Sequence, residues 1–175
     1  MRKASLILLL TTAFIITFAQ SEDASARRKT VPSVDIKDIK GNIYNTSNIT
    51  NDGKPIIIDF WATWCKPCVK ELGAIADVYD DWVKETGVKV FAISVDDPRS
   101  SSQVKPFVDG KGWNYTVLLD QNSDFKRAMG VGPIPQTFIL NGKGEIVWTH
   151  TTYAEGNEND IIEVIRKIVK GEEIK

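Results

Sequence analysis

The chain has 175 residues, with 22 Lys and Arg against 23 Asp and Glu, a length that suits one domain with a sizeable core. Its formal net charge of −1 gives no electrostatic case for nucleic-acid binding, and 42% hydrophobic residues exclude a disordered or fibrous chain. Two cysteines and one histidine exclude a disulfide-dense scaffold and a histidine-rich metal site.

The first segment, residues 1–19, is typical of a secretory signal peptide, because a basic start is followed by an apolar run. That run is shorter than the roughly 20 residues of a membrane span. We favour cleavage after Ala19 over cleavage after Ala26, and an uncleaved segment would anchor the chain in the membrane. Residues 20–30 are polar and lack periodicity, so we expect a flexible lead. The sequence therefore predicts a periplasmic or otherwise extracytoplasmic protein, in a compartment where disulfides persist.

The first half of the expected domain, which we place at residues 31–175, begins with a β-hairpin of strands 34–39 and 43–44. A β-branched apolar run at 56–60 predicts a central strand that is buried on both faces. A helix follows the cysteines and ends at Gly87. Its apolar face consists of Val69, Leu72, Ile75, Ala76, Tyr79, Trp82 and Val83.

The second half alternates short strands and helices. The expected strands are 88–95, 115–119, 137–140 and 145–151, and the expected helices are 100–112, 123–129 and a last helix capped by Asn157 or Asn159. The residues of that last helix expected to be buried are Ile161, Ile162, Val164, Ile165, Ile168 and Val169. The order β-β-β-α-β-α-β-α-β-β-α predicts an α/β fold with a mixed sheet.

Cys65 and Cys68 lie where the central strand meets the amphipathic helix. Free backbone N–H groups and the positive dipole end of a helix stabilise a thiolate there, so we expect the pKa of Cys65 to fall below about 8.5. Lys66 adds a positive charge, and Pro67 suits the first helical turn. Cys68 lies one turn deeper and should ionise less easily. This asymmetry predicts that Cys65 attacks a substrate disulfide and that Cys68 resolves the mixed disulfide.

Two other interpretations of the cysteine pair are weaker. A permanent disulfide across four residues constrains the unfolded chain little. A zinc site would need two more ligands, and only His150 and carboxylates remain. We therefore expect a redox-active Cys65–Cys68 disulfide, with no metal and no tightly bound cofactor.

The segment 59–68 resembles the active-site segment of thioredoxins, and 132–138 resembles the loop with a cis-proline that precedes a strand in that family. The hairpin at 34–44 and the segment 96–119 resemble the exported TlpA/ResA branch. The resemblance covers about residues 31–170. It implies a thioredoxin-like fold, with a central mixed β-sheet flanked by helices, an N-terminal β-hairpin and an inserted helix–strand segment.

Two acidic residues match positions in this family. Asp59, six residues before Cys65, matches a buried acid, and a carboxylate in an apolar strand has a raised pKa that suits a proton acceptor for Cys68. The alternative is an Asp at a strand end that faces solvent. Glu71, three residues after Cys68, matches the active-site glutamate of the ResA-like branch, and the alternative is a solvated helix residue. Which acid handles the proton stays open.

The resemblance also implies residues that contact the substrate. Pro135 is the family's cis-proline, and its loop would lie against the attacking cysteine. The Ile134 backbone would then pair with an extended substrate strand. Trp64 offers an apolar docking surface, next to Lys66 and Pro67, which we also expect to contact the substrate.

Three other residues are not expected to take part in the chemistry. We expect Trp61 to pack in the core and His150 to be structural or solvated. Gln136 stands where cytochrome-maturation reductases of this branch often carry Glu, so the sequence departs from the pattern of those reductases at this position.

These observations predict an exported, monomeric thiol–disulfide oxidoreductase that reduces disulfides in other exported proteins. It would need a membrane thiol electron donor. A disulfide-donating oxidase would share every motif. A peroxide-reducing enzyme would have its nucleophilic cysteine outside a pair spaced like Cys65 and Cys68. A metallochaperone would need soft metal ligands in addition to the two thiols.

Overall fold

A computed structural model of the chain describes residues 29–174. The expected signal peptide, and the lead up to residue 28, lie outside the described residues. The Lys29 carbonyl accepts a hydrogen bond from the Ile146 N–H at 2.8 Å, and Thr30 forms an isolated bridge with Glu145. The domain therefore reaches two residues further toward the N-terminus than the expected start at residue 31.

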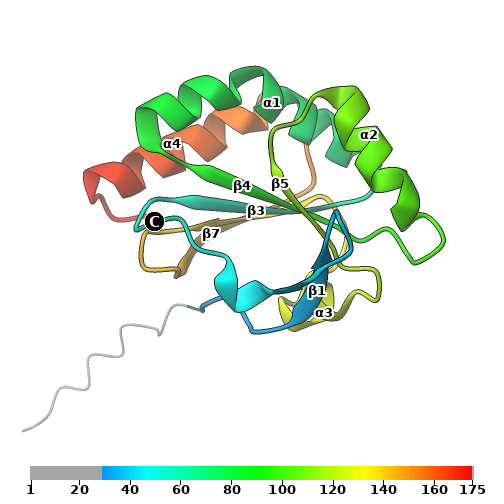
Figure 1. The fold of residues 1–175 in the computed structure, drawn as a ribbon. Helices are drawn as coiled ribbons and strands as arrows, with labels where there is room; N and C mark the ends of the chain where they lie inside the picture. The colour runs from blue at the N-terminus through cyan, green and yellow to red at the C-terminus, as the bar shows by residue number, and fades with distance from the viewer. Residues whose placement is uncertain (1–28, 175) are drawn as a thin grey trace, which may run out of the picture.

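The described residues form a seven-stranded sheet and four α-helices (Figure 1). The strands are β1 (Asp35–Asp38), β2 (Ile43–Asn45), β3 (Ile56–Trp61), β4 (Lys89–Ser94), β5 (Thr116–Leu119), β6 (Gln136–Leu140) and β7 (Ile146–Thr151). The helices are α1 (Lys66–Thr86), α2 (Val104–Lys111), α3 (Asp124–Ala128) and α4 (Asn157–Lys170). Two single-turn 3-10 helices are η1 (Thr46–Asn48) and η2 (Ser101–Gln103). The predicted order of strands and helices is confirmed.

The sheet is mixed, with the strand order β2-β1-β5-β4-β3-β6-β7. The middle strands β3, β4 and β5 are parallel, whereas β6 is antiparallel to β3, and β1 is antiparallel to β5. All six residues of β3 are buried, as the apolar run predicted. The loop after β3 therefore leaves from the centre of the sheet, which fixes the position of the cysteines.

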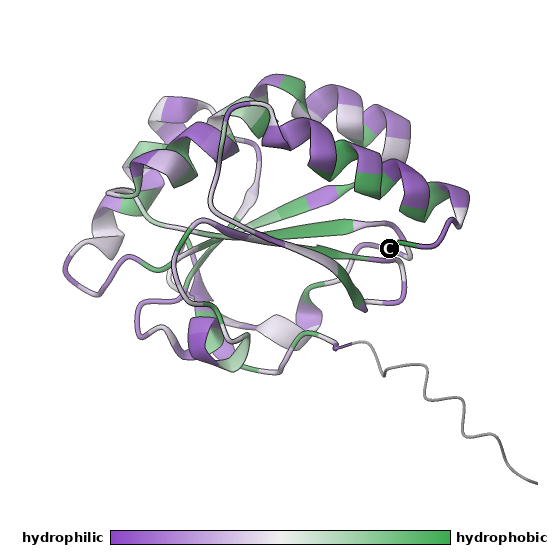
Figure 2. Cartoon of the chain, turned by 180° about the vertical axis from the view of Figure 1, so that it is seen from behind, coloured by the Kyte–Doolittle hydropathy of each residue, from purple (hydrophilic) through white to green (hydrophobic). Residues whose placement is uncertain are grey.

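Apolar side chains pack on both faces of the sheet, and the strands between the helices are strongly hydrophobic (Figure 2). Helices α1, α2 and α4 cover one face, while Phe125 of α3 packs on the other. Successive residues of a strand point to opposite faces. Ile57 and Trp61 accordingly pack on the α1 side, and Ile58 and Phe60 on the α3 side. Asp59, in phase with Ile57 and Trp61, faces the α1 layer.

Two apolar residues expected in the core are exposed. Val83 of α1 and Val169 of α4 lie at the edge of the apolar face of their helix. Trp82 of α1 and the Ile161 and Ile165 side chains of α4 are buried in the core of this layer, as expected. A sequence period cannot locate the edge of a helical face, because a contact between two helices covers a narrower stripe than the run of apolar residues.

The start of α4 also differs from expectation. Gly156, with φ of 99°, occupies the cap position, and Asn157 is the first helical residue. The Asn157 side chain accepts the Ala154 N–H at 2.7 Å, and Asn159 donates to the Gly156 carbonyl at 3.0 Å. Both asparagines therefore shape the preceding turn rather than cap the helix.

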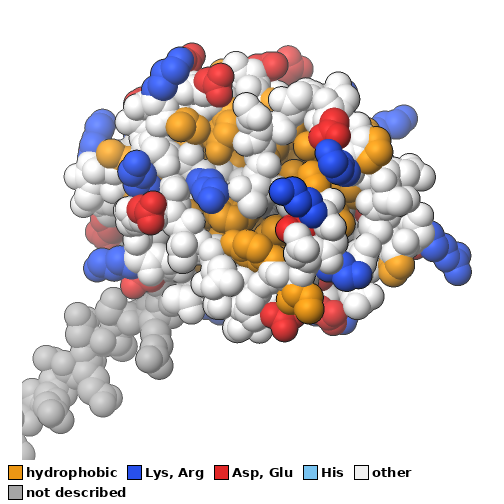
Figure 3. Space-filling view, in the orientation of Figure 1, with side chains coloured by type: hydrophobic (Ala, Val, Ile, Leu, Met, Phe, Trp, Pro, Cys, Tyr) orange, Lys and Arg blue, Asp and Glu red, His pale blue; other side chains and the backbone are white. Residues whose placement is uncertain are grey.

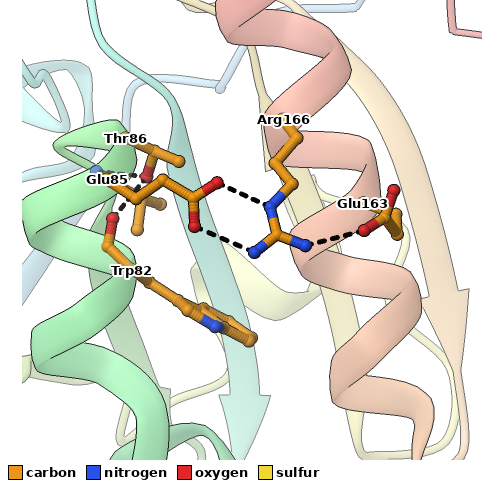
Figure 4. Close-up of polar contacts among 6 residues, drawn as sticks. Trp82, Glu85, Thr86, Glu163 and Arg166 are labelled. Carbon is orange, nitrogen blue, oxygen red and sulfur yellow. Dashed lines mark hydrogen bonds and ion pairs between the residues drawn. The ribbon is translucent and has the colours of Figure 1, made fainter.

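The contact between α1 and α4 combines an apolar core with an ion-pair cluster at its surface. Arg166 donates to both carboxylate oxygens of Glu85, at 2.6 and 2.9 Å, and to Glu163 at 2.7 Å (Figure 4). These side chains are partly solvated, so water screens their attraction. Burial of Ile161 and Ile165 is the stronger contribution to this contact.

Basic and acidic side chains are interspersed on the face shown in Figure 3, with hydrophobic side chains between them. This face carries no region of a single charge sign, in keeping with the near-zero net charge. Within residues 29–174, no helix combines the length and the apolar composition that crossing a membrane requires.

We expect Ile165→Ala to lower the free energy of unfolding by about 2–5 kcal/mol, because it leaves a cavity between α4 and the sheet. The loss for Arg166→Ala should be much smaller, because its partners are solvated. Urea unfolding of both variants measures the difference. Equal losses would contradict this account of the helix contact.

Candidate active site

Cys65 lies at the N-cap of α1, at the end of the loop that follows β3. Its Sγ accepts a hydrogen bond from the Cys68 N–H at 3.3 Å, and its carbonyl accepts the Val69 N–H at 3.0 Å. Pro67 sits in the first turn of α1, where no backbone donor is lost. The Cys65 sulfur therefore contacts the positive end of the helix.

The two cysteines form a disulfide. Cys65 exposes 5% of its surface and Cys68 none. Cys68 is the more buried of the two, as expected. Cys65 is nevertheless more buried than its position at the start of the helix suggested. Oxidation leaves both sulfurs in the site, with Cys65 on the solvent side of the bond.

The loop before β6 faces the disulfide. The Ile134–Pro135 peptide bond is cis, as the resemblance implied, and Cys65 Sγ lies 3.9 Å from the Ile134 carbonyl oxygen. Pro135 is buried, and its carbonyl accepts the Thr152 N–H at 3.0 Å. Within residues 29–174 the Ile134 N–H donates to no backbone acceptor. The Ile134 atom that lies near the attacking sulfur is the carbonyl oxygen.

Around the disulfide, several side chains face outward. Trp64 is 65% exposed, and Lys66 and Pro67 are exposed beside it. Trp61 is fully buried and packs against Phe107 and Trp113, as expected of a packing residue.

A groove of about 940 Å³ runs along α1 from this end of the helix. Lys66, Pro67 and Lys70 line one part of it, and Tyr153 and Glu158 line another. The groove therefore begins next to the cysteines and borders the N-terminal turn of α4.

Asp59 and Glu71 are both fully buried, and the structure brings them together. Asp59 pairs with Thr137 across β3 and β6, and Glu71 lies one helical turn after Cys68. The Thr137 Oγ1 lies 3.0 Å from Asp59 Oδ2 and 2.9 Å from Glu71 Oε1. Neither acid is a solvated surface residue, so both alternatives to a buried acid are wrong.

Burial governs how these acids ionise. Burial and the charge of Glu71 raise the pKa of Asp59 well above 3.8, against the opposing effect of the Thr137 hydrogen bond. Burial also raises the pKa of Glu71 to about 7, with the Thr137 hydrogen bond lowering it and the charge of Glu158 adding to it. The Glu71 carboxyl group can therefore exchange a proton near neutral pH, next to a second buried acid, Asp59, whose pKa is also raised.

The loop that carries the cysteines is held by a buried carboxylate. Asp96 accepts hydrogen bonds from the Thr63 N–H at 2.9 Å, the Thr63 hydroxyl at 2.6 Å and the Ser94 hydroxyl at 2.8 Å. Thr63 lies two residues before Cys65, so these bonds fix the conformation of the loop that leads from β3 to α1.

Asp96 and Thr137 were not singled out from the sequence. Asp96 follows the carboxyl end of β4, two residues after it, and Thr137 follows Pro135 by two residues. A polar residue just beyond a buried strand was the available signal for Asp96. No sequence pattern marks the contacts of Thr137, since Asp59 and Glu71 are far from it along the chain.

The remaining candidates lie at the edge of the site. Gln136 is half-buried at the start of β6. His150 is half-buried, pairs with Thr137 across β6 and β7, and stacks on Trp148 with ring centroids 5.5 Å apart. Its Nε2 is buried and has no hydrogen-bond partner within the described chain. Residues 29–174 hold no group of three or more His, Cys, Asp or Glu side chains arranged to bind a metal ion.

The sequence of the chain is similar to those of known proteins. The family model described as the AhpC/TSA family matches residues 28–149. The chain is similar to the thiol-disulfide oxidoreductase ResA of Geobacillus kaustophilus, with 32% identity over 83% of each chain. It is also similar to ResA of Bacillus subtilis, with 31% identity over 89% of this chain and 84% of that one.

A solved structure agrees. A thioredoxin-like protein from Porphyromonas gingivalis is 51% identical, superposes with a TM-score of 0.73, and matches over 80% of this chain and 92% of its own. The family model and these similarities, which extend over most of the chain, show that the chain belongs to the AhpC/TSA thioredoxin-like family, among the ResA-like thiol–disulfide oxidoreductases.

Proposed function

We propose that this chain is exported and reduces disulfides in other exported proteins through Cys65 and Cys68. The observation that carries the proposal is the position of Cys65 Sγ, which accepts the Cys68 N–H at the start of α1 and lies beside the Ile134–Pro135 loop. A thiolate formed there is stabilised by the start of the helix.

In the first step, the Cys65 thiolate attacks one sulfur of the substrate disulfide. The substrate S–S bond breaks as the Cys65–substrate bond forms. The other substrate sulfur leaves as a thiolate and takes a proton from water. Cys65 is then held in a mixed disulfide, and Cys68 is still a thiol.

In the second step, Cys68 loses its proton to the buried carboxyl groups of Asp59 and Glu71. The Cys68 thiolate attacks Cys65 Sγ and releases the second substrate sulfur, which also takes a proton. The substrate gains two electrons and two protons. The protein is left with the Cys65–Cys68 disulfide seen in the structure.

The substrate-contacting surface consists of Trp64, Lys66, Pro67, Ile134 and Pro135. Trp64 supplies the large exposed apolar area, and the free Ile134 N–H supplies a backbone donor to an extended substrate segment. Only a disulfide that an extended or flexible segment presents can reach Cys65, because Cys65 is nearly enclosed.

The proposal that the chain is exported is based on residues 1–19, whose sequence pattern is that of a signal peptide. A protein that acts as a reductant outside the cytoplasm needs fresh electrons, so we propose a membrane thiol donor that reduces the Cys65–Cys68 disulfide. A strongly oxidising reduction potential of this couple would instead indicate a disulfide-donating oxidase.

Trapping tests the roles of the two cysteines. We expect Cys68→Ala to accumulate mixed disulfides between Cys65 and exported proteins, because the second step is blocked. Cys65→Ala is the matched control, and it should trap none. Non-reducing gels followed by mass spectrometry identify the partners. Partners trapped by Cys65→Ala but not by Cys68→Ala would reverse the assignment.

The buried acids should make stability depend on pH. The folded protein keeps protons on Glu71 and Asp59 that the unfolded chain releases, so the free energy of unfolding falls as pH rises. The fall begins near pH 3.8 for Asp59, and for Glu71 it runs from about 4.5 through 7. For Glu71 alone the loss is about 3 kcal/mol. The contribution of Glu71 is fully present below pH 4.5, and that of Asp59 below pH 3.8.

Urea unfolding of the oxidised protein between pH 4.5 and 8 measures this loss. Glu71→Gln should flatten the curve, whereas the control Glu173→Gln, at an exposed position, should leave it unchanged. Parallel curves for the wild type and Glu71→Gln would contradict the account of Glu71.

A further inference from the structure

The Thr137 hydroxyl lies between two buried carboxyl groups. Its Oγ1 is 3.0 Å from Asp59 Oδ2 and 2.9 Å from Glu71 Oε1, and all three side chains are buried. The outer oxygens, Asp59 Oδ1 and Glu71 Oε2, have no hydrogen-bond partner within the described chain. Thr137 is therefore the group that both acids share.

A count of protons limits the charge on this cluster. A threonine hydroxyl carries one proton, so it can donate to only one of its two carboxyl neighbours. The other contact is a hydrogen bond only if that carboxyl is protonated and donates to the lone pair of Oγ1. Two ionised carboxylates would also repel each other in a site without solvent. When both contacts are hydrogen bonds, at least one of the two carboxyl groups is therefore protonated, and an acid, a hydroxyl and a carboxylate can stand in a row.

We propose that Thr137 is a positioning residue that joins Asp59 and Glu71 into a single unit, which at neutral pH holds one proton in the oxidised protein and takes up the proton that Cys68 loses. This inference rests on the proposed mechanism, and it assigns the proton to the unit rather than to either acid. Reversal of the Thr137 O–H direction lets a proton that enters at one carboxyl leave from the other.

The groups around the unit distinguish its two ends. Glu158 of α4 and Tyr153, whose hydroxyl donates to Glu158 at 3.1 Å, lie next to the Glu71 end and line the groove along α1. Tyr115 of β5 is the group beside Asp59, and its hydroxyl is committed to the Leu72 carbonyl at 2.7 Å. The Glu71 end is therefore the end nearer to solvent.

The proton count closes for the step that oxidises the cysteine pair. Cys68 gives its proton to the unit, which then holds two protons and is neutral. One proton leaves to water from the Glu71 end, and the unit returns to one proton and one negative charge. When the thiol donor reduces the pair again, Cys68 regains its proton from water. His150 of β7 is the strand partner of Thr137, and an imidazole can carry a proton, so its contribution must be tested separately.

The matched pair of variants is Thr137→Val, which removes the hydroxyl and keeps the shape, and Thr137→Ser, which keeps the hydroxyl. Reduced protein is mixed with excess dithiobis(nitrobenzoate). Attack by Cys65 releases the first coloured thiolate, and resolution by Cys68 releases the second. The two phases therefore report the two steps separately, across a range of pH.

We expect Thr137→Val to slow the second phase by about 10-fold to 100-fold and to change its pH profile. This is less than the roughly 100-fold or more that a general base contributes, because Thr137 positions the acids and does not itself take the proton. The first phase should keep its wild-type rate. Thr137→Ser should restore the second phase to within about 3-fold of wild type. His150→Gln should leave the pH profile unchanged.

A second-phase rate and pH profile of Thr137→Val equal to the wild type would overturn the proposal. Loss of the pH dependence in His150→Gln would also overturn it, because the titrating group would then be His150. A wild-type protein without a first phase would refute the proposed exchange by Cys65, which is a different failure from a defect confined to the second phase.

If Thr137→Val does not fold, Glu71→Gln supplies the test. A glutamine amide can donate to Thr137 Oγ1 and mimics the protonated acid permanently, while Thr137 still donates to Asp59. We expect Asp59 to ionise at a lower pH than in the wild type, as followed by the infrared band of protonated carboxylic acids. If the band in Glu71→Gln kept the wild-type pH dependence, the proposal that the two acids share a proton would be overturned.

Discussion

The hydrogen bond from the Cys68 N–H to Cys65 Sγ, at the first turn of α1, is the interaction on which the chemistry of this protein depends. The fold holds this contact in place. The fully buried β3 ends at the centre of the sheet, Asp96 holds Thr63 in the loop that follows, and the Ile134–Pro135 loop closes over the sulfur. A small shift of α1 against β3 would separate the sulfur from these groups.

The buried acids impose a cost that this fold tolerates. Asp59 and Glu71 occupy positions on β3 and α1 that would otherwise carry apolar side chains, and neither has a basic partner among the described ion pairs. Burial disfavours their charged forms, and only the Thr137 hydroxyl offsets this. The apolar contacts of α1 and α4 with the sheet offset the unfavourable free energy of burying these two acids. A carboxyl group with a pKa near 7 is useful to a thiol that must lose a proton.

Much of this arrangement could be predicted from the sequence, because local signals coincide there. The apolar run 56–60, the cysteine spacing and Gly87 mark a buried strand, a helix start and a helix end within thirty or so residues. The link between Asp59 and Glu71 could not be predicted, because it runs through Thr137 on a strand far along the chain. The exposure of Val169 depends on how two helices pack, which a single helix pattern does not contain.

The acidity of the Cys65 thiol tests the central claim most directly. In the reduced protein, the rate of alkylation of Cys65 by iodoacetamide is followed against pH, with Cys68→Ala removing the second thiol. The account predicts a pKa for Cys65 below the value of about 8.5 for a free cysteine, because the start of α1 stabilises the thiolate. A pKa at or above that value would contradict the claim that the helix makes Cys65 the attacking sulfur.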